Sequence, residues 1–448
     1  MADDWRLRSL RSILVPRSVR NRPELPLLTV ARERGVFVRS ADDANHNVIP
    51  EDLSNYKIAR TGDLVVNKMK AWQGSLGLAP VDGIVSPAYF VFEADFAVPL
   101  YGEYLLRSKP YVAKFGAASD GVRIGQWDLN IPCMRNIEVH LPPAEEQAAI
   151  VKYLAHANAR IDKAIAAKRR LIALLEEQEQ ANAESLVRGD TEQDQTSTGL
   201  PWLSTVPASW ELLRVKKVLV GLEQGWSPQC DAQPAGPDEW GVLKAGCSNH
   251  GRFRSEENKK LPEGQEARPE LEVKHGDLLV SRANTRELVG SAAVALNPRE
   301  KLIFSDKTFR LKVRTDRADN EFLALAMGSR SSRDQIEAGA VGASQSMQNI
   351  GQGVIANLWI GLPPVDVQKA IVDEFHKRSA ELETVVGKTR REIDLLSEFR
   401  TRLVADVVTG QVDVRAIAAT LPHAPESFDN TVSATDDDLE EALSEGEE

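Results

Sequence analysis

The sequence predicts an α+β protein in which two mixed α/β globular domains alternate with two long helices. The helices are expected to pair as an antiparallel, coiled-coil-like spacer, so that the chain forms an internal pseudo-twofold repeat. Three features support this prediction: a duplicated sequence pattern, a one-sided apolar stripe in two charged segments, and short strand-like runs elsewhere. The 448 residues fit two to four folding units of roughly 150 residues, and 42% apolar residues suffice to build their cores.

The duplication is clearest at two Leu-Pro-Pro sequences. Residues 141–154 read LPPAEEQAAIVKYL and residues 362–375 read LPPVDVQKAIVDEF, an offset of 221 positions without a gap. A second pair of anchors, Trp5 and Trp210, opens the two halves at an offset of 205. The repeated unit is far longer than the ~50-residue repeat of a solenoid. We therefore interpret it as a duplicated domain followed by a helix.

The segment after each Leu-Pro-Pro has the pattern of a long amphipathic helix. At 100° per residue its apolar side chains fall in a stripe about 80° wide, and the opposite face is densely charged. Gly189 and Gly410 stand where C-caps belong. Helices of about 45 residues exceed the ~12-residue norm, which favours a paired arrangement over helices that each pack only on their own domain. We expect the interface of the pair to contain Leu154, Ile161, Ile165, Ile172, Leu175, Phe375, Leu382, Val386, Ile393 and Leu396.

The rest of the chain is rich in runs typical of strands. Residues 63–66, 83–92, 277–280 and 309–313 are such runs, while apolar residues at 101–106 and 321–326 predict short helices. A polar stretch without a period follows the first long segment and is typical of a linker. The expected organisation is a first globular domain at 1–143, a long helix at 144–189, a linker at 190–204, a second globular domain at 205–364, a second long helix at 365–410 and an acidic disordered tail at 411–448.

The formal net charge of −11 is concentrated at the C-terminus. Ten acidic residues and no Lys or Arg lie between Glu426 and Glu448, so residues 1–425 hold 55 basic and 56 acidic residues. Acidity therefore does not exclude a local basic face for nucleic acid. No apolar run of ~18 residues and no signal-peptide pattern occurs, so membrane insertion and secretion are not expected. The three cysteines lack the spacing of a zinc site or a disulfide framework.

Further motifs occur in the same order in both halves. Residues 62–65 (GDLV) and 276–279 (GDLL) precede strand-like runs, and residues 199–203 (GLPWL) announce the second domain. Each long segment carries a glutamine, Gln147 or Gln368, shortly after its Leu-Pro-Pro. This ordered, repeated set strongly resembles the specificity (S) subunits of Type I restriction-modification systems, over nearly the whole chain to about residue 415.

The resemblance implies a noncatalytic DNA-binding subunit. Each globular domain would be a target recognition domain that reads one half of a bipartite target in double-stranded DNA. The helices would space the domains and dock methyltransferase (M) subunits, and restriction/translocase (R) subunits would join through the M subunits. No cofactor is expected on this chain, because S-adenosylmethionine, ATP and Mg belong to the partner subunits. Because the sequence shows neither a membrane-spanning run, nor a signal-peptide pattern, nor a disulfide framework, we expect a cytoplasmic location and no membrane partner.

Polar loops after matched strands are the candidate DNA contacts. Base readout needs forked donors and amide side chains, and further polar groups bind phosphates. Such side chains follow the strand-like runs in both domains, although each loop could also be an ordinary solvated turn. The candidates are Lys68, Lys70, Trp72, Gln73, Arg123 and Gln126 in the first domain, and Arg282, Asn284, Arg286, Lys307, Gln345, Gln348 and Asn349 in the second.

Catalytic alternatives are weakly supported. Residues 86–89 (SPAY) distantly resemble the (D/N/S)PPY motif of amino-methyltransferases. However, Ala88 replaces the second proline of that motif, and no glycine-rich nucleotide-binding turn precedes it. A strand end with an aromatic residue in the core is the favoured interpretation. Asp277 and Glu287 lack a nuclease arrangement, and Asp277 is more simply a turn residue. Neither a Walker A motif nor HExxH occurs. The alternative that remains is a coiled-coil scaffold presenting two binding modules without sequence-specific DNA recognition.

Overall fold

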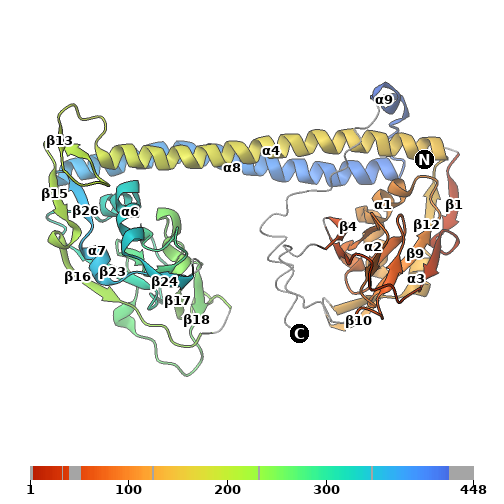
Figure 1. The fold of residues 1–448 in the computed structure, drawn as a ribbon, viewed down its shortest axis with the longest axis horizontal. Coiled ribbons are helices and arrows are strands. Elements are labelled where there is room, and N and C mark those ends of the chain that lie inside the picture. The colour runs from red at the N-terminus through yellow and green to blue at the C-terminus, as the bar shows by residue number, and fades with distance from the viewer. Residues whose placement is uncertain are drawn as a thin grey trace. The chain divides into compact units, whose positions relative to one another are not determined.

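The computed structural model describes residues 4–32, 34–39, 52–123, 126–230, 233–344 and 347–422, with the side chains of residues 122, 123, 126, 343 and 344 left undescribed. The chain forms two compact units: unit 1 comprises residues 1–169 and 390–448, and unit 2 comprises residues 170–389. Each unit therefore holds one globular domain and one part of each long helix, α4 (Ala144–Arg188) and α8 (Val365–Val408), drawn in yellow and blue in Figure 1. Unit 1 is discontinuous in sequence, unlike any segment of the expected linear organisation.

The globular domain of unit 1 is built on an antiparallel four-stranded sheet with the order β2-β9-β6-β7. Its first and last strands, β1 and β12, pair with each other in a separate two-stranded sheet. The elements are β1 (Arg6–Ser9), η1 (Leu10–Ser12), β2 (Leu14–Arg17), β3 (Leu28–Ala31), β4 (Gly35–Val38), β5 (Lys57–Ala59), β6 (Leu64–Asn67), η2 (Ala71–Gln73), β7 (Leu76–Leu78), β8 (Gly83–Val85), β9 (Tyr89–Ala94), α1 (Pro99–Arg107), α2 (Lys109–Ala117), β10 (Ser119–Arg123), β11 (Gln126–Leu129), α3 (Ile131–Arg135), β12 (Glu138–Leu141) and, after α8, α9 (Arg415–Thr420).

The globular domain of unit 2 repeats this plan. Its antiparallel four-stranded sheet has the order β16-β23-β19-β21, and β15 pairs with β26. The elements are β13 (Gln195–Ser197), β14 (Thr205–Pro207), β15 (Glu211–Arg214), η3 (Val215–Lys217), β16 (Leu219–Gln224), β17 (Gly241–Leu243), η4 (Ala245–Gly251), β18 (Asn258–Lys260), η5 (Pro269–Leu271), β19 (Leu278–Ser281), β20 (Ala283–Asn284), β21 (Ala292–Val294), β22 (Leu302–Ile303), β23 (Thr308–Val313), α5 (Asn320–Gly328), α6 (Arg330–Gly339), β24 (Val341–Ser344), β25 (Met347–Asn349), α7 (Gln352–Ala356) and β26 (Trp359–Leu362). The mixed α/β class expected from the sequence is confirmed.

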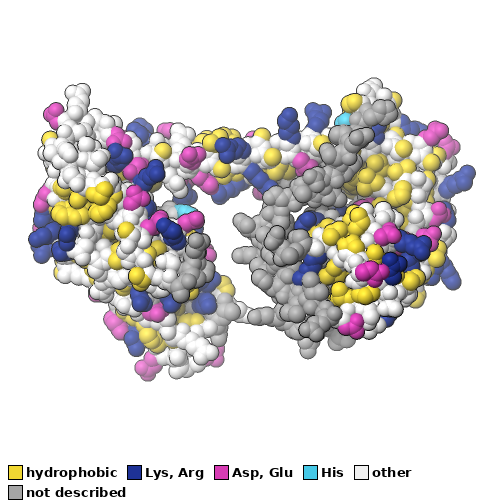
Figure 2. Space-filling view, viewed as in Figure 1, with side chains coloured by type: hydrophobic (Ala, Val, Ile, Leu, Met, Phe, Trp, Pro, Cys, Tyr) yellow, Lys and Arg dark blue, Asp and Glu magenta, His cyan; other side chains and the backbone are white. Residues whose placement is uncertain are grey.

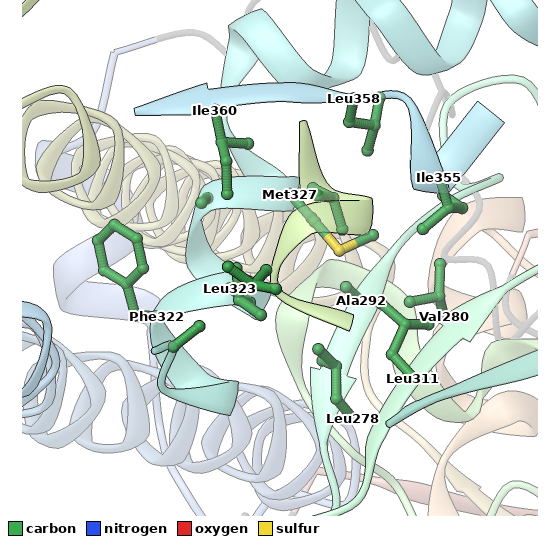
Figure 3. Packing of buried hydrophobic residues seen from close by; sticks show 14 of the residues in the cluster. Leu278, Val280, Ala292, Leu311, Phe322, Leu323, Met327, Ile355, Leu358 and Ile360 are labelled. Atoms are coloured by element: carbon green, nitrogen blue, oxygen red, sulfur yellow. The ribbon is translucent and has the colours of Figure 1, made fainter. Parts of the chain in front are cut away.

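The core of each domain includes turns of both long helices. In unit 2 the sheet packs against α5 and β26, and Val187 of α4 and Val372 of α8 join the same cluster. Figure 3 shows the interior side chains of this cluster, among them Leu278, Val280, Ala292, Leu311, Phe322, Leu323, Met327, Ile355, Leu358 and Ile360. In unit 1, Leu154 of α4 and Val407 of α8 join the domain core in the same way. Burial of these apolar residues anchors the helices to the domains.

The residues expected at the helix interface are all withdrawn from solvent to some degree. Leu154, Ile161 and Ile165 are 0%, 6% and 8% exposed, and Ile172, Leu175, Phe375, Leu382, Val386, Ile393 and Leu396 are half-buried. Within unit 1, Asp162 of α4 pairs with Arg400 of α8 and Lys168 with Glu392, so α4 numbers fall as α8 numbers rise. Figure 2 shows Lys, Arg, Asp and Glu side chains on the visible surface of the helices, together with hydrophobic side chains.

Equivalent residues close both ends of each long helix. Gln147 Oε1 accepts a hydrogen bond from Val98 N (3.1 Å), and Gln368 Oε1 accepts one from Asp319 N (2.8 Å). Each glutamine also donates to the first proline carbonyl of its Leu-Pro-Pro. At the other ends Gly189 and Gly410 have φ of +65° and +73°, the left-handed conformation that favours glycine. A Cβ on Gly189 would lie 2.9 Å from Trp210, and one on Gly410 would lie 3.0 Å from Trp5.

Two segments differ from the sequence expectation. Residues 190–204, expected as a linker, contain β13, which pairs with β14 and leaves Leu203 only 6% exposed. Residues 411–422, assigned to the acidic tail, instead pack on unit 1: Val414 and Ala418 of the α9 region are each 2% exposed. Apolar side chains inside both polar stretches drive this burial, and a composition average hides them. The acidic run from Glu426 lies outside the described residues.

Within the described part of the chain, no helix has the length and apolarity needed to span a bilayer.

Candidate nucleic-acid interface

A glycine-aspartate turn precedes the inner strand β6 of the sheet in unit 1 and the inner strand β19 of the sheet in unit 2. Gly62 and Gly276 have φ of +85° and +86°, which accounts for glycine at both positions. Asp63 Oδ2 accepts a hydrogen bond from Arg60 N at 2.9 Å, and Asp277 Oδ2 accepts one from Lys274 N at 2.9 Å. Both aspartates therefore close the turn before β6 and β19. This is the turn role expected for Asp277.

An arginine neutralises each turn aspartate. In unit 1, Arg17 Nε lies 2.8 Å from Asp63 Oδ2, and Arg17 Nη2 lies 2.9 Å from Glu93. Desolvation by burial nevertheless raises the pKa of Asp63, against the lowering effects of Arg17 and the Arg60 amide. In unit 2, Arg310 lies 3.1 Å from Asp277 and 2.6 Å from Glu223. In both domains an arginine thus joins the turn aspartate at the strand start to a more exposed glutamate, Glu93 or Glu223.

The strand-end loop of unit 1, residues 68–73, is tied to the β10–β11 hairpin. Leu129 N donates to Lys68 O at 3.0 Å, and the Lys68 ammonium pairs with Asp128. The rings of Trp72 and Trp127 meet edge to face with centroids 5.0 Å apart, and Trp72 Nε1 donates to Met69 O. The structure therefore brings residues 68–73 together with β11, as a single polar and aromatic surface.

The remaining first-domain candidates lie on the same loop and hairpin. Lys70 and Gln73 are half-buried in the strand-end loop. Arg123 ends β10 and Gln126 begins β11, but their side chains lie outside the described residues. The backbone thus places the candidates near one another, and the readout role of each remains a prediction.

The strand-end loop of unit 2, residues 282–286, is built in the same way. Ile350 N donates to Arg282 O at 3.0 Å, and β20 pairs with β25 so that Asn284 faces Gln348. Arg282 Nη1 donates to Asp306 O at 3.1 Å, which holds the half-buried guanidinium beside the exposed Lys307. Arg282 thus occupies the place that Lys68 holds in unit 1. The hairpin β24–β25 corresponds to β10–β11.

Two second-domain candidates already have partners within the protein. Asn284 Nδ2 donates to Asn249 Oδ1 at 3.0 Å, and its own Oδ1 accepts from Thr285 N at 2.9 Å. The exposed Arg286 pairs with Glu337 of α6 at 3.1 Å. A base contact by Asn284 would compete with these bonds. Asn349 is half-buried in β25 beside Gln348, and Gln345 lies outside the described residues.

Two curated proteins, both specificity subunits of Type I restriction enzymes, are similar in sequence to this chain. The chain is 32% identical over 183 residues to the Type I restriction enzyme EcoEI specificity subunit of Escherichia coli, a match that spans 40% of this chain and 31% of that protein's length. It is 24% identical over 327 residues to the Type I restriction enzyme MjaVIII specificity subunit of Methanocaldococcus jannaschii, covering 70% and 71% of the two chains. This chain is similar to Type I restriction specificity subunits. No protein-family model matches it.

A solved structure supports the shared fold. A chain from work on complex assembly and conformational transition of the type I R-M system aligns with a TM-score of 0.57 at 18% identity. The alignment covers 92% of this chain and 99% of that chain. At this identity the likeness establishes the fold alone. Together with the two similar specificity subunits, this likeness confirms the resemblance predicted from the repeated motifs, and the roles of single residues stay predictions.

Sequence reasoning missed the η4 loop, which touches the strand-end loop of unit 2 through Asn249. Its Ser248 and Cys247 are fully buried, and burial raises the pKa of the Cys247 thiol to about 12. The loop is a short irregular segment whose sequence carries no periodic signal.

Among the described residues, no cluster of three His, Cys, Asp or Glu side chains could hold a metal ion. Tyr89 opens β9 and packs half-buried against the apolar side chains beneath it, as in the interpretation favoured for residues 86–89.

Proposed function

We propose that this chain is the noncatalytic specificity subunit of a Type I restriction-modification complex. Each unit carries one target recognition domain, and the two domains read the two halves of a bipartite sequence in double-stranded DNA. One observation carries the proposal. In both domains a basic residue, Lys68 or Arg282, directly follows an inner strand of the four-stranded sheet, β6 or β19. Its carbonyl accepts a hydrogen bond at 3.0 Å from Leu129 N of β11 or from Ile350 N just after β25. The sequence similarity to specificity subunits gives this duplicated surface its meaning.

The helices supply the other part of the function. We propose that α4 and α8 pair as an antiparallel spacer and dock methyltransferase subunits, through which restriction/translocase subunits join. Exposed apolar side chains support docking: Leu171, Leu174 and Val385 in unit 2 are 42–44% exposed, and Leu395 and Phe399 in unit 1 are 57% and 55% exposed. S-adenosylmethionine, ATP and Mg then act on the partner subunits, in the cytoplasm.

A domain exchange tests the one-domain, one-half-site assignment. Residues 210–361 should be replaceable by the equivalent domain of another specificity subunit. The segment begins beside β15 and ends in β26, and these two strands pair with each other. The chimera should methylate a hybrid target with one half unchanged and the spacing retained. Methylation-footprint sequencing of cells carrying the chimera and its partner subunits measures the result. A change in both half-sites, or in neither, would contradict the assignment. Retention of DNA without sequence preference would favour the scaffold alternative.

Single substitutions at the two equivalent basic residues give a finer test. Arg282→Ala should weaken or relax one half-site by ~1–3 kcal/mol if its guanidinium reads a base, and Lys68→Ala should do the same at the other half-site. Uniform weakening, with a salt slope reduced by about one, would mark a phosphate contact instead. Lys217→Ala, which removes an exposed lysine elsewhere on unit 2, is the matched control. Filter binding over a salt series and a panel of mutated half-sites separates these outcomes.

A further inference from the structure

The η4 loop of unit 2 is anchored on its own domain. Cys247 and Ser248 are both 0% exposed, and Ser248 Oγ donates to Ser291 O at 3.2 Å. Arg254 N donates to Cys247 O at 2.9 Å, which closes the loop at its base. Because its buried residues sit in the domain interior, the loop cannot shift without disturbing that packing.

A left-handed turn leads from this anchor to Arg252. His250 and Gly251 have φ of +57° and +72° in succession. Such a pair of left-handed residues reverses the chain sharply and is uncommon where one of them is not glycine. His250 itself is exposed, so burial of its side chain does not account for the conformation. The turn places the next residue, Arg252, against the long helices.

Arg252 bridges the domain to both helices within unit 2. Its Nη2 donates to the two carboxylate oxygens of Glu179 on α4 at 3.1 and 3.0 Å. Its Nη1 lies 3.0 Å from Glu383 Oε1 on α8. Glu179 is only 19% exposed and also accepts a hydrogen bond from Ser379 of α8. A planar guanidinium shared by two carboxylates has a defined direction, unlike a single surface ion pair.

The other side of the loop contacts the candidate DNA surface. Asn249 Oδ1 accepts a hydrogen bond from Asn284 on β20, and Asn284 lies beside Arg282 and opposite Gln348. A continuous path of contacts therefore runs from the helices through Arg252 and Asn249 to the strand-end loop of unit 2. Every member of this path belongs to the same compact unit.

We propose that Arg252 is a positioning residue, which holds the recognition domain of unit 2 at a fixed orientation on the helices. It thereby determines the number of base pairs at which the second half-site is accepted. The inference rests on the proposed function. Without Arg252 the domain keeps its core attachment through Val187 and Val372 but loses the ion pairs that join its η4 loop to Glu179 and Glu383. Half-sites displaced by one base pair should then become acceptable.

The test uses the full chain with its methyltransferase partner. Duplexes carry the native target with its spacer unchanged, shortened or lengthened by one base pair. The wild type should bind the native spacer best, and Arg252→Ala should reduce that preference by about tenfold, the scale of two cooperating ion pairs. Lys259→Ala, which removes an exposed lysine from the same domain, should leave the preference unchanged. The charge exchange R252E/E179R/E383R should restore it, whereas R252E alone should not.

Hydrogen exchange of the free chain gives a readout that does not depend on DNA. The amides of Arg252 and Arg254 donate within the loop, so their exchange should accelerate in Arg252→Ala and not in Lys259→Ala. Unchanged exchange, or faster exchange with an intact spacer preference, would overturn the inference alone. A wild-type complex without sequence-specific binding would instead contradict the proposed function.

Discussion

The two domains place an aspartate at the same turn, Asp63 at 4% exposure and Asp277 with its side chain 16% exposed, and pair it with an arginine from different strands. In unit 1 the arginine lies on the edge strand β2 and its second partner, Glu93, on β9. In unit 2 the arginine, Arg310, lies on β23, the counterpart of β9, and Glu223 lies on β16, the counterpart of β2. The charges have exchanged strands while the sheet order is the same. Each domain therefore places an arginine beside the turn aspartate, although the arginine comes from a different strand in each.

The exchange leaves the two networks unequal. Arg310 is on an inner strand, its side chain is 6% exposed, and it also donates to the carbonyls of Glu270 and Glu272 at 3.0 and 2.9 Å. Arg17 is on an edge strand, its side chain is 15% exposed, and it meets two carboxylates only. The same sheet topology therefore carries arginines that differ in burial and in number of partners, and substitution can measure whether their contributions to stability differ.

The largest expected difference between the units concerns the helix stripe. Ile161→Asp should destabilise unit 1 by ~3–5 kcal/mol, because it buries an unpaired carboxylate at a position that is 6% exposed. Leu382→Asp in unit 2 should cost less, since Leu382 is only half-buried. Urea unfolding followed by tryptophan fluorescence measures both, with the exposed Lys163→Ala as control. Equal losses would mean that burial does not distinguish the two parts of the stripe.

Removal of the two turn arginines should give the next largest effects. Arg310→Ala should cost ~3 kcal/mol, because it removes a cation shared by two carboxylates and the donor of two carbonyls, and Arg17→Ala should cost ~2 kcal/mol. Thermal unfolding of the two variants compares them directly. If Arg17→Ala proves the more damaging, the number of bonds made by the arginine is not what sets the cost.

The loss in Arg17→Ala should also depend on pH. Burial already raises the pKa of Asp63 above its ordinary value, and removal of Arg17 raises this pKa further. A carboxyl whose folded-state pKa is raised favours the folded state increasingly as pH falls through that pKa. The penalty should therefore shrink between pH 7 and pH 4 relative to wild type. Parallel pH profiles of unfolding free energy for the variant and the wild type would refute this.

A smaller effect distinguishes the helix anchors. The buried Tyr101 donates to Val408 O at 3.0 Å, whereas the position 221 residues later is Phe322, which has no hydroxyl. Tyr101→Phe should cost about 1 kcal/mol by leaving a helix-terminal carbonyl without its donor. Tyr153→Phe, at a half-buried tyrosine of α4, serves as the control in denaturant titrations. A neutral Tyr101→Phe would show that water replaces the hydroxyl there.

The smallest perturbation is chemical labelling. Cys133 on α3 of unit 1 is exposed, whereas Cys247 of unit 2 is buried with a pKa raised to about 12. At pH 8 the thiolate of Cys247 is scarce and inaccessible, so a disulfide reagent should modify Cys133 quickly and Cys247 only after unfolding. Peptide mass mapping locates the label, and Cys133→Ser should remove the fast phase. Rapid labelling of Cys247 in the native chain would show that η4 opens.

Local signals in the sequence predicted the bounds of the two long helices and the starts of two inner strands well. Proline before and glycine after each stripe placed α4 and α8 within a residue or two of their observed bounds, and the glycine-aspartate pairs located the starts of β6 and β19. These features depend on neighbouring residues alone. The strand prediction for residues 83–92 was wrong in one respect: the run forms two strands, β8 and β9, separated by residues 86–88.

Features that depend on distant partners could not be read in this way. Asn284 has the residue type of a base reader, yet its amide is bonded to Asn249, 35 positions away. Arg17 is 46 positions from Asp63, so the charge network of unit 1 has no local signature. The sequence thus located the candidate loops, and only the fold reveals which side chains in them are already engaged.

The discontinuity of unit 1 has a consequence for the order in which the protein can be made. The hydrogen bond between Tyr101 and Val408 joins residues 307 positions apart, and the core around Leu154 includes Val407 and Val414. A nascent chain therefore emerges with the first domain synthesised but its helix-facing surface uncovered. Unit 2 is contiguous and can close first, although it comes second in the sequence. Only when the end of α8 leaves the ribosome can the earliest residues complete their fold, so premature release should expose unit 1 to aggregation while unit 2 is spared.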